Sequence, residues 1–229
     1  MMSPVEVVET KFGPKTLHVC KDGEDGNTDW VSVYEVSFPP GQRQDVKELE
    51  NELVSGVMEL DETRDQDGNI LCMTITEVFR EAEAEPPFLL ACYTAVVPEM
   101  RGQGIGSIHR RKLGELLEDE YPSYLGIFSE IESTRETGID AAAMNIRVRR
   151  KAFFMRLGLI PLDIDYYFPS YVKGEQPIAG ELLWVPFGDA SISRETLSTI
   201  VSRIYVEGYK LAKDDPLIGR VTQSIGKGS

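Results

Sequence analysis

The chain has few cysteines and histidines, and neither type shows the spacing of a reactive site. Its 229 residues include three cysteines and two histidines. Cys20, Cys72 and Cys92 lie far apart in the sequence, without metal-ligand or redox spacing, so we expect them to be reduced and to pack as apolar residues. His18 and His109 complete neither a zinc site nor a Ser-His-Asp triad. The sequence therefore predicts a protein that works without a metal.

Positive charge is also scarce. The 24 lysines and arginines face 38 aspartates and glutamates, which gives a net charge of −14 and a pI near 4.7. Binding to nucleic-acid phosphates needs a clustered positive surface, so nucleic acid is excluded as an expected partner. An acidic surface favours a cationic substrate such as an amine, but it is also a common means of keeping a protein in solution.

Long apolar runs are missing as well. No stretch approaches the length of a membrane-spanning helix, and the first residues show no cationic region followed by an apolar run. We therefore expect no membrane partner and a cytoplasmic location. With 41% hydrophobic and 27% charged residues, a chain of this length can bury one sizeable core, which predicts a single domain over residues 1–229.

The hydrophobic periodicity predicts an alternation of strands and helices. Helices are expected over 43–58, 104–119, 140–157 and 193–213. Strands are expected over 17–20, 56–64, 70–79, 88–97, 125–131 and 182–185. An Asp-Gly turn at 65–69 joins two of these strands into a hairpin, whereas 21–29 is expected to be a surface loop and 80–87 an acidic linker. This order indicates an α/β protein with a mixed sheet, a core over about 15–175 and a strand-helix extension over 176–215.

The most informative stretch runs from Ala95 to Gly106, where a predicted strand meets a predicted helix. Gly102, Gly104 and Gly106 remove side chains at positions where a ligand's phosphates would otherwise meet Cβ atoms. The backbone N–H groups exposed there lie at the positive end of the helix, which favours an anion by roughly 0.3 to 1 kcal/mol. Arg101 can add a full charge. The sequence therefore predicts a site for a cofactor that carries a diphosphate.

Two common diphosphate motifs do not fit this stretch. The dinucleotide pattern G-x-G-x-x-G would need glycine where Ser107 stands, and the Gly-Lys-Ser/Thr of the P-loop is absent. The pattern that does fit is R-x-x-G-x-G, at Arg101, Gly104 and Gly106, and it resembles the GNAT superfamily of acyl-CoA N-acyltransferases. The resemblance covers roughly residues 30–168 and continues in Glu130 to Glu132, Asn145 and residues 153–159.

The resemblance implies a fold and a binding site. The fold would be a central, mixed but mostly antiparallel sheet of about six to seven strands, flanked by helices and followed by a C-terminal helix. The site would bind acetyl-CoA through Ala95, Val96, Val97, Arg101, Gly102, Gln103, Gly104, Ile105, Gly106, Ser107 and Asn145. A backbone N–H near Val97 would polarise the thioester carbonyl. Asn145, which we expect on the inward side of its helix with Ala141, Met144, Val148, Ala152 and Met155, would contact pantetheine.

The resemblance also implies a reaction in which an amine attacks the thioester directly, without a covalent enzyme intermediate. The tyrosine that family members commonly use to protonate the thiolate is replaced here by Phe154. Tyr167, next to Tyr166, is our candidate for that role, although both tyrosines fit equally well as core residues. The candidates for the base are Glu77, Glu85, Glu130 and Glu132, among which we choose Glu77.

Other residues near the motif have simpler interpretations. Arg110, Arg111, Lys112 and the basic residues of 147–151 could meet phosphates, but most are expected on solvated helix faces. His109 follows Ile105 by one helical turn, so a core position is expected for it rather than a role as base.

The sequence thus predicts an acetyl-CoA-dependent N-acetyltransferase that acts on a small-molecule primary amine. A non-catalytic acyl-CoA-binding module, prompted by Phe154, and an acyltransferase for protein N-termini or lysines are the alternatives. The terminal strand and helix would either close the fold or form a homodimer.

Overall fold

The computed structural model describes residues 6–21, 28–82 and 85–226, which form two compact units. The first unit comprises Met1–Val78 and Leu90–Pro122, and the second comprises Phe79–Leu89 and Ser123–Ser229. Most of the loop predicted at 21–29 and part of the linker predicted at 80–87 lie outside the described residues.

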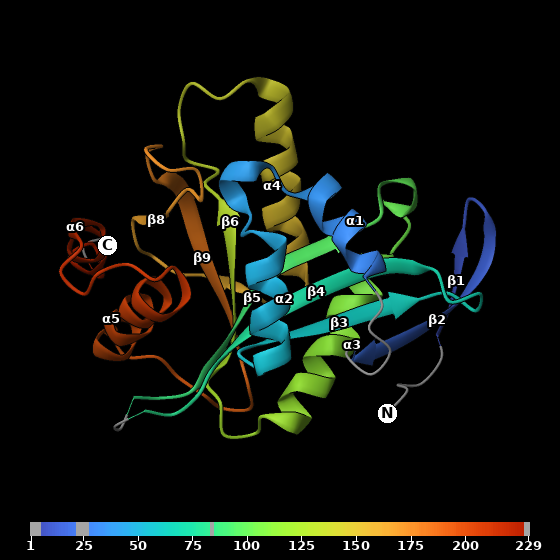
Figure 1. Ribbon diagram of the computed structural model, residues 1–229, viewed down its shortest axis with the longest axis horizontal. Helices are drawn as coiled ribbons and strands as arrows, with labels where there is room; N and C mark the ends of the chain where they lie inside the picture. Colours follow the sequence, from blue (N-terminus) through green and yellow to red (C-terminus); the bar gives the residue numbers. More distant parts are fainter. Residues whose placement is uncertain (1–5, 22–27, 83–84, 227–229) are drawn as a thin grey trace. The chain divides into compact units, whose positions relative to one another are not determined.

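The first unit contains an antiparallel meander. Its strands are β1 (Glu6–Thr10), β2 (Gly13–Lys21), β3 (Met58–Arg64), β4 (Ile70–Phe79) and β5 (Phe88–Val96). They lie beside one another in sequence order, drawn from blue to green in Figure 1, with β1 to β4 paired antiparallel. The ends of β4 and β5 that include Phe79 and Phe88–Leu89 belong to the second unit. The predicted strands are confirmed here, whereas β1 was not predicted.

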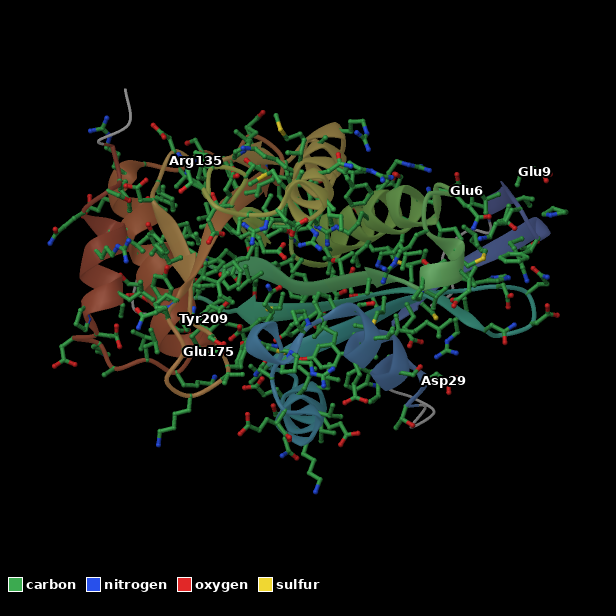
Figure 2. The ribbon with its side chains drawn as sticks, turned by 90° about the horizontal axis from the view of Figure 1, so that it is seen from above. Glu6, Glu9, Asp29, Arg135, Glu175 and Tyr209 are labelled. Carbon is green, nitrogen blue, oxygen red and sulfur yellow. The ribbon has the colours of Figure 1, made fainter. Side chains whose placement is uncertain are left out.

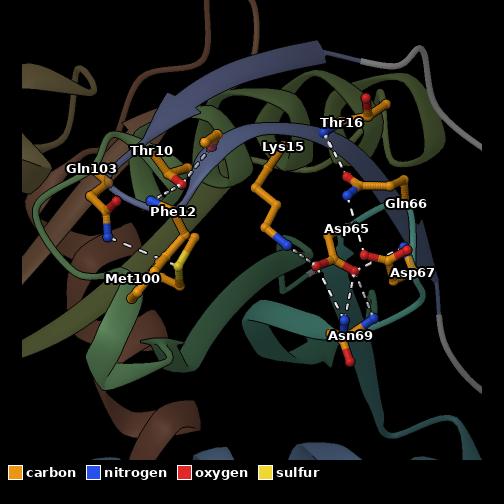
Figure 3. Close-up of polar contacts among 11 residues, drawn as sticks. Thr10, Phe12, Lys15, Thr16, Asp65, Gln66, Asp67, Asn69, Met100 and Gln103 are labelled. Carbon is orange, nitrogen blue, oxygen red and sulfur yellow. Dashed lines mark hydrogen bonds and ion pairs between the residues drawn. The ribbon is translucent and has the colours of Figure 1, made fainter.

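The turn between β3 and β4 has the expected Asp-Gly chemistry. Gly68 adopts φ 85°, and the carboxylate of Asp65 accepts hydrogen bonds from the backbone N–H groups of Asp67 (3.0 Å) and Asn69 (2.9 Å). Lys15 on β2 forms an ion pair with Asp65 at 2.7 Å (Figure 3). The pKa of the Asp65 carboxyl is lowered because these hydrogen bonds outweigh its burial.

Helices cover both faces of this meander. They are α1 (Asp29–Ser37), η1 (Pro40–Gln42), α2 (Val46–Ser55), η2 (Pro98–Met100) and α3 (Ile105–Glu120). Helix α2 is shorter than predicted, because Asp45 caps its start and Gly56, at φ 70°, ends it. Helix α1 was not predicted from its valine-rich sequence; Trp30, Val33 and Tyr34 are buried in the core.

The core of the first unit has two layers. On one face, residues of α1 and α2 pack against Leu60, Met73 and Ile75. On the other face, Leu71 and Cys72 pack against Met100 and the start of α3. Figure 2 shows α1 and α2 on one side of the strands and α3 on the other. The loop that precedes α3 is mostly exposed, and Met100 anchors it in the second of these layers.

The second unit is built around one long strand, β9. Its elements are β6 (Gly126–Glu132), α4 (Ala141–Arg156), β7 (Ile160–Pro161), β8 (Tyr166–Phe168), β9 (Ile178–Pro186), α5 (Arg194–Arg203), the π-helical turn η3 (Ile204–Gly208) and α6 (Pro216–Thr222). Strand β6 pairs antiparallel with β9 from Gly126 opposite Pro186 to Glu132 opposite Gly180. Strands β7 and β8 also pair with β9. The described residues thus contain nine strands, two more than the upper limit of the prediction.

The predicted inward face of α4 is wrong. Val148 and Met155 are 49% and 50% exposed, and Ala141 and Asn145 are also exposed. The face toward β6 and β9 carries Phe153 and Phe154, which pack with Ile131 and Leu183, and beside them cations that pair with carboxylates. These ion pairs join Arg147 to Glu136, Arg150 to Glu132 and Lys151 to Glu181. The partners that neutralise these charges are distant in sequence. A prediction from hydrophobic periodicity within the helix therefore chose the face that is exposed to solvent.

The ends of the helices follow local signals with one exception. Gly158, at φ 88°, follows the end of α4 as predicted. Ser193 caps α5, and Leu197 and Ile200 are buried as expected. Pro216, predicted to end this helix, occupies the first turn of α6 instead, where its missing N–H costs nothing. None of the helices in the described part of the chain combines the length and apolarity that a membrane crossing requires.

Candidate cofactor-binding site

The glycine-rich loop connects β5 to α3 within the first unit. After β5 ends at Val96, the turn η2 leads to Gly102 at φ 78° and Gly104 at φ 85°, both left-handed conformations that L side chains rarely adopt. A Cβ atom added at either position would meet no heavy atom within 4 Å. The backbone therefore requires these glycines, and the space beside them is open to a ligand.

The start of α3 offers backbone donors to that space. Gly104 is the N-cap of this 16-residue helix and makes no side-chain cap hydrogen bond. No side chain of the cap residue therefore takes up the first N–H groups of the helix, which normally need partners. The N–H of Ser107 donates to the carbonyl of Gly104 at 3.0 Å. The loop and helix start present the arrangement that binds phosphate groups in many proteins.

The side chain of Gln103 holds the loop in place through hydrogen bonds to two other segments. The Oε1 of Gln103 accepts a hydrogen bond from the backbone N–H of Lys11 at 2.7 Å. Its Nε2 donates to the carbonyl of Glu99 at 3.0 Å and approaches the sulfur of Met100 (Figure 3). Met100 and Ile105 are buried beneath the loop. Gln103, predicted as a cofactor contact, thus also ties the loop to the turn between β1 and β2.

Arg101 turns back along the chain. Its Nε donates to the carbonyl of Val96 at 3.0 Å, and its Nη2 donates to the hydroxyl of Ser37 at 3.1 Å. The side chain is exposed, so it can also reach an anion in solution. Its contact with the cofactor stays a prediction.

Successive backbone amides at the end of β5 point to opposite edges of the strand. The N–H of Val97 donates to the carbonyl of Leu71 on β4 at 3.0 Å. Alternate residues of a strand point their N–H and C=O groups to opposite edges, so those of Val96 point away from β4. The Val97 N–H is thus used within the sheet, and the amide near Val97 that would polarise a thioester stays a prediction. Ala95 is buried and contributes to the core.

Helix α3 buries two polar residues, one that was expected in the core and one that was expected in solvent. His109 is fully buried, with Nδ1 and Nε2 each 2.8 Å from the hydroxyls of Thr63 and Thr74, which confirms its core position. Burial lowers its pKa to about 3, so the ring is neutral. Arg110, expected in solvent, is buried, and burial lowers its pKa to about 10 against the opposing effects of Cys72 and Asp61.

The neighbouring cations are paired within the fold. Arg111 lies 3.0 Å from the carboxylate of Glu6, and Lys112 lies 3.0 Å from that of Glu115. Both pairs are at the surface, where such pairs contribute ~0–1 kcal/mol. A cofactor phosphate would have to compete with these carboxylates for the two cations.

The residues predicted for catalysis belong to different units. Glu77 lies on β4 of the first unit, 5% exposed and opposite Met58 of β3. Tyr167 lies on β8 of the second unit, where the guanidinium of Arg220 is 3.9 Å from its ring centre. Its carbonyl accepts a hydrogen bond from the hydroxyl of Tyr205. Phe154 is 7% exposed and packs with Leu159 in an apolar cluster.

The remaining sequence candidates of the second unit have other surroundings. Asn145 is exposed on α4, so its predicted inward position is wrong, and its contact with pantetheine stays a prediction. Glu132 is paired with Arg150, and Glu85 lies 3.3 Å from the Nε of Arg203.

Glu130 has the most unusual environment among the candidate carboxylates. Its Oε1 accepts a hydrogen bond from the hydroxyl of Tyr166 at 2.5 Å, and its Oε2 accepts one from the hydroxyl of Tyr209 at 2.9 Å. Burial raises the pKa of Glu130 to about 7, although both hydrogen bonds act in the opposite direction. A glutamate inside the apolar strand sequence GIFSEIE was the available signal. Tyr209, 79 residues away, could not be connected to it from the sequence.

Solved structures share this fold. A protein from Bacteroides thetaiotaomicron, described as an acetyltransferase of the GNAT family, matches with a TM-score of 0.62 at 19% identity, over 85% of this chain and 99% of its own. NAA60 of Arabidopsis thaliana in complex with acetyl-CoA matches with a TM-score of 0.55 at 12% identity, over 75% and 98%. The ribosomal-protein-S18-alanine N-acetyltransferase of Escherichia coli matches with a TM-score of 0.51 at 16% identity, over 76% and 96%.

No protein-family model and no curated protein sequence matches the chain. The structural likenesses, all below 20% identity, establish that the chain has the fold of GNAT acetyltransferases. The fold expected from the R-x-x-G-x-G resemblance is thereby confirmed.

Proposed function

We propose that this protein is an acetyl-CoA-dependent N-acetyltransferase that transfers the acetyl group directly to a primary amine. The observation that carries the proposal is the loop with Gly102 and Gly104 in left-handed conformations, open space beside them and the start of α3 behind. The GNAT fold, in which NAA60 of Arabidopsis thaliana was solved with acetyl-CoA, supports the same donor.

The residues of the loop would bind the diphosphate of coenzyme A. Backbone N–H groups from Gly102 to Gly106 supply donors without any side-chain rearrangement, and the dipole of α3 adds favourable potential. A backbone amide near Val97 would stabilise the oxyanion that forms on the thioester carbonyl. The nitrogen lone pair of the amine forms the new C–N bond, the C–S bond breaks, and the thiolate takes a proton released by the nitrogen.

Proton transfer requires a base and an acid for which the sequence selected Glu77 and Tyr167. The variants Glu77→Gln and Tyr167→Phe test these roles through the pH dependence of turnover. Coenzyme A is itself a moderately good leaving group, so the reaction can proceed without a dedicated acid. A rate in Tyr167→Phe that equals the wild-type rate would assign Tyr167 to packing against Arg220 alone.

The experiment that tests the proposal is thiol release from acetyl-CoA in the presence of polyamines, amino acids, aminoglycosides, arylamines and peptides. Mass spectrometry of the products identifies the acceptor class. We expect release with at least one small-molecule amine and an increase of 42 Da in that amine. Binding of acetyl-CoA without release for any acceptor would contradict an enzyme and support the acyl-CoA-binding module.

The alternative of a non-catalytic module rests on Phe154. This residue fills the place of the expected acid and is buried among apolar neighbours, where a hydroxyl would need a partner. An acyltransferase for protein N-termini or lysines is the further alternative, and the likeness to the Escherichia coli enzyme motivates it. Turnover of peptides but of no free amine would favour that alternative.

A further inference from the structure

A groove in the second unit runs beside helix α6. It has a volume of about 540 Å³, within the range of small-molecule sites, and it is open to solvent. Its lining comes from α6, from the residues directly after that helix and from the residue before β8, namely Asp165, Pro216, Gly219, Arg220, Gln223 and Ser224. Because all of them belong to the second unit, the groove is complete within that unit.

Hydrogen bonds hold the walls of the groove in place. The backbone N–H of Asp165 donates to the hydroxyl of Ser224 at 2.9 Å, and that hydroxyl donates to the carbonyl of Val221 at 2.7 Å. Ser224 is buried, so this link is shielded from water. At the other end of α6, the carboxylate of Asp215 accepts a hydrogen bond from the N–H of Leu217 at 2.9 Å. The residue before β8 and both ends of α6 are thus fixed before any ligand binds.

The cation of the groove is Arg220. Its guanidinium carbon lies over the ring of Tyr167, 3.9 Å from the ring centre, and this contact orders a long side chain. Within residues 6–21, 28–82 and 85–226, the guanidinium forms no ion pair and no hydrogen bond. The side chain is exposed. Its N–H donors are therefore available to an anion in the groove.

The groove also carries a carboxylate, that of the exposed Asp165. In the described part of the chain, neither this carboxylate nor the guanidinium of Arg220 has an ion-pair partner, although both line the same groove. Two opposite charges that do not neutralise each other leave space for a molecule that carries both. A phosphate or another dianion would instead place its negative charge close to Asp165.

Gly219 keeps the groove open between these charges. It lies inside α6, where glycine is a poor helix former. A Cβ atom added at this position would meet no heavy atom within 4 Å. Gln223, three residues after Arg220, lines the same groove and can donate a hydrogen bond from its amide to an anion held by Arg220.

We propose that this groove binds a free α-amino acid as a zwitterion, with its carboxylate on Arg220 and Gln223 and its ammonium group on Asp165. The contact with Tyr167 orders Arg220 before binding, which lowers the entropy that is lost when the guanidinium holds a carboxylate. Binding at this groove does not require acetyl transfer, because none of the lining residues belongs to the glycine-rich loop.

Calorimetry on the full-length protein without acetyl-CoA tests the proposal. The probes are the proteinogenic L-amino acids, followed by the methyl ester and the N-acetyl derivative of each one that binds. The ester lacks the charged carboxylate and the N-acetyl derivative lacks the ammonium group, so we expect each to bind at least about 10-fold more weakly. Inorganic phosphate should not compete with the amino acid.

Charge variants assign the binding to the groove. Arg220→Gln and Asp165→Asn each remove one charge from an exposed side chain, and each is expected to weaken binding at least about 10-fold. Lys213→Gln and Asp163→Asn are the matched controls, because they remove the same charges from exposed residues outside the lining. Both controls should keep the wild-type affinity.

A variant that fills the groove tests the site without a change of charge. Gly219→Leu is expected to abolish binding, because its side chain would occupy the open space. Gly114→Leu, in α3 with equally open surroundings, is the control and should bind as the wild type does.

Three outcomes would overturn the proposal. The first is a wild type that binds no amino acid, and the second is equal affinity in the groove variants and their controls. The third is an N-acetyl derivative that binds as tightly as the amino acid, which would mean a carboxylate site without a role for Asp165. A protein that binds an amino acid but releases no thiol from acetyl-CoA would refute the proposed function alone.

Discussion

The glycine-rich loop and the Glu130 cluster are built in opposite ways. The loop is contiguous from Val96 to Gly106, and its properties come from backbone conformation and the start of one helix. The Glu130 cluster brings together β6, β8 and the residue after η3, and its properties come from side chains buried next to one another. A local site depends on a few adjacent residues, here glycines that have no side chain. An assembled site depends on the packing of a whole unit.

The largest expected effect concerns the loop. Gly104→Ala places a methyl group in the open space and strains a left-handed backbone, so we expect acetyl-CoA affinity to fall by about 10- to 100-fold, or ~1.4 to 2.7 kcal/mol. Isothermal titration calorimetry measures the affinity. Gly68→Ala is the matched control, because Gly68 has the same φ of 85° and equally open surroundings in the β3–β4 turn. Equal losses of affinity in both variants would contradict a cofactor site at the loop.

The next prediction concerns stability at the Glu130 cluster. Because the folded pKa of about 7 lies above the unfolded value near 4.5, the folded state binds more protons between these values and wild-type stability falls as pH rises through 7. Glu130→Gln lacks this loss. We expect its free energy of unfolding, relative to wild type, to be about 3 kcal/mol larger at pH 8 than at pH 4. Urea denaturation at both pH values measures it, and a difference independent of pH would contradict the assigned environment.

The smallest expected effect returns to the loop. Gln103→Ala removes the hydrogen bonds to Lys11 and Glu99, which should cost about 0.5 to 1.5 kcal/mol of stability. Acetyl-CoA affinity should fall by only about 3- to 10-fold, since the backbone donors stay. Thermal denaturation and calorimetry check the two values. A loss of affinity as large as in Gly104→Ala would mean that Gln103 contacts the cofactor itself, as the sequence predicted.

The local site could be predicted from the sequence because its signals are local. The Arg101, Gly104 and Gly106 pattern, the end of β5 and the start of α3 all lie within a dozen residues. Similarly, Asp65 with Gly68 predicted the β3–β4 turn, and Gly158 predicted the end of α4. In each case a turn or a cap depends on residue types whose conformational preferences hold in any protein.

The assembled features could not be predicted, for a different physical reason. Beside Phe153 and Phe154, the inward face of α4 is charged because Glu132, Glu136 and Glu181 lie opposite its cations, and no periodicity within the helix contains that information. Helix α1 has a valine-rich sequence that favours strands, and the burial of Trp30, Val33 and Tyr34 stabilises it as a helix. Tertiary contacts outweigh local preference in both.

The charged attachment of α4 has a consequence for how the protein responds to its solution. The ion pairs of Arg147, Arg150 and Lys151 lose attraction as added salt screens them, whereas the apolar contacts of Phe153 and Phe154 with Ile131 and Leu183 are not weakened by salt. Mobility of α4, followed by hydrogen exchange, should therefore rise with sodium chloride. Ile146, Val148 and Met155 on the exposed face of α4 form apolar surface that can contact other molecules when the helix is mobile. Concentrated samples should therefore aggregate more readily in high salt.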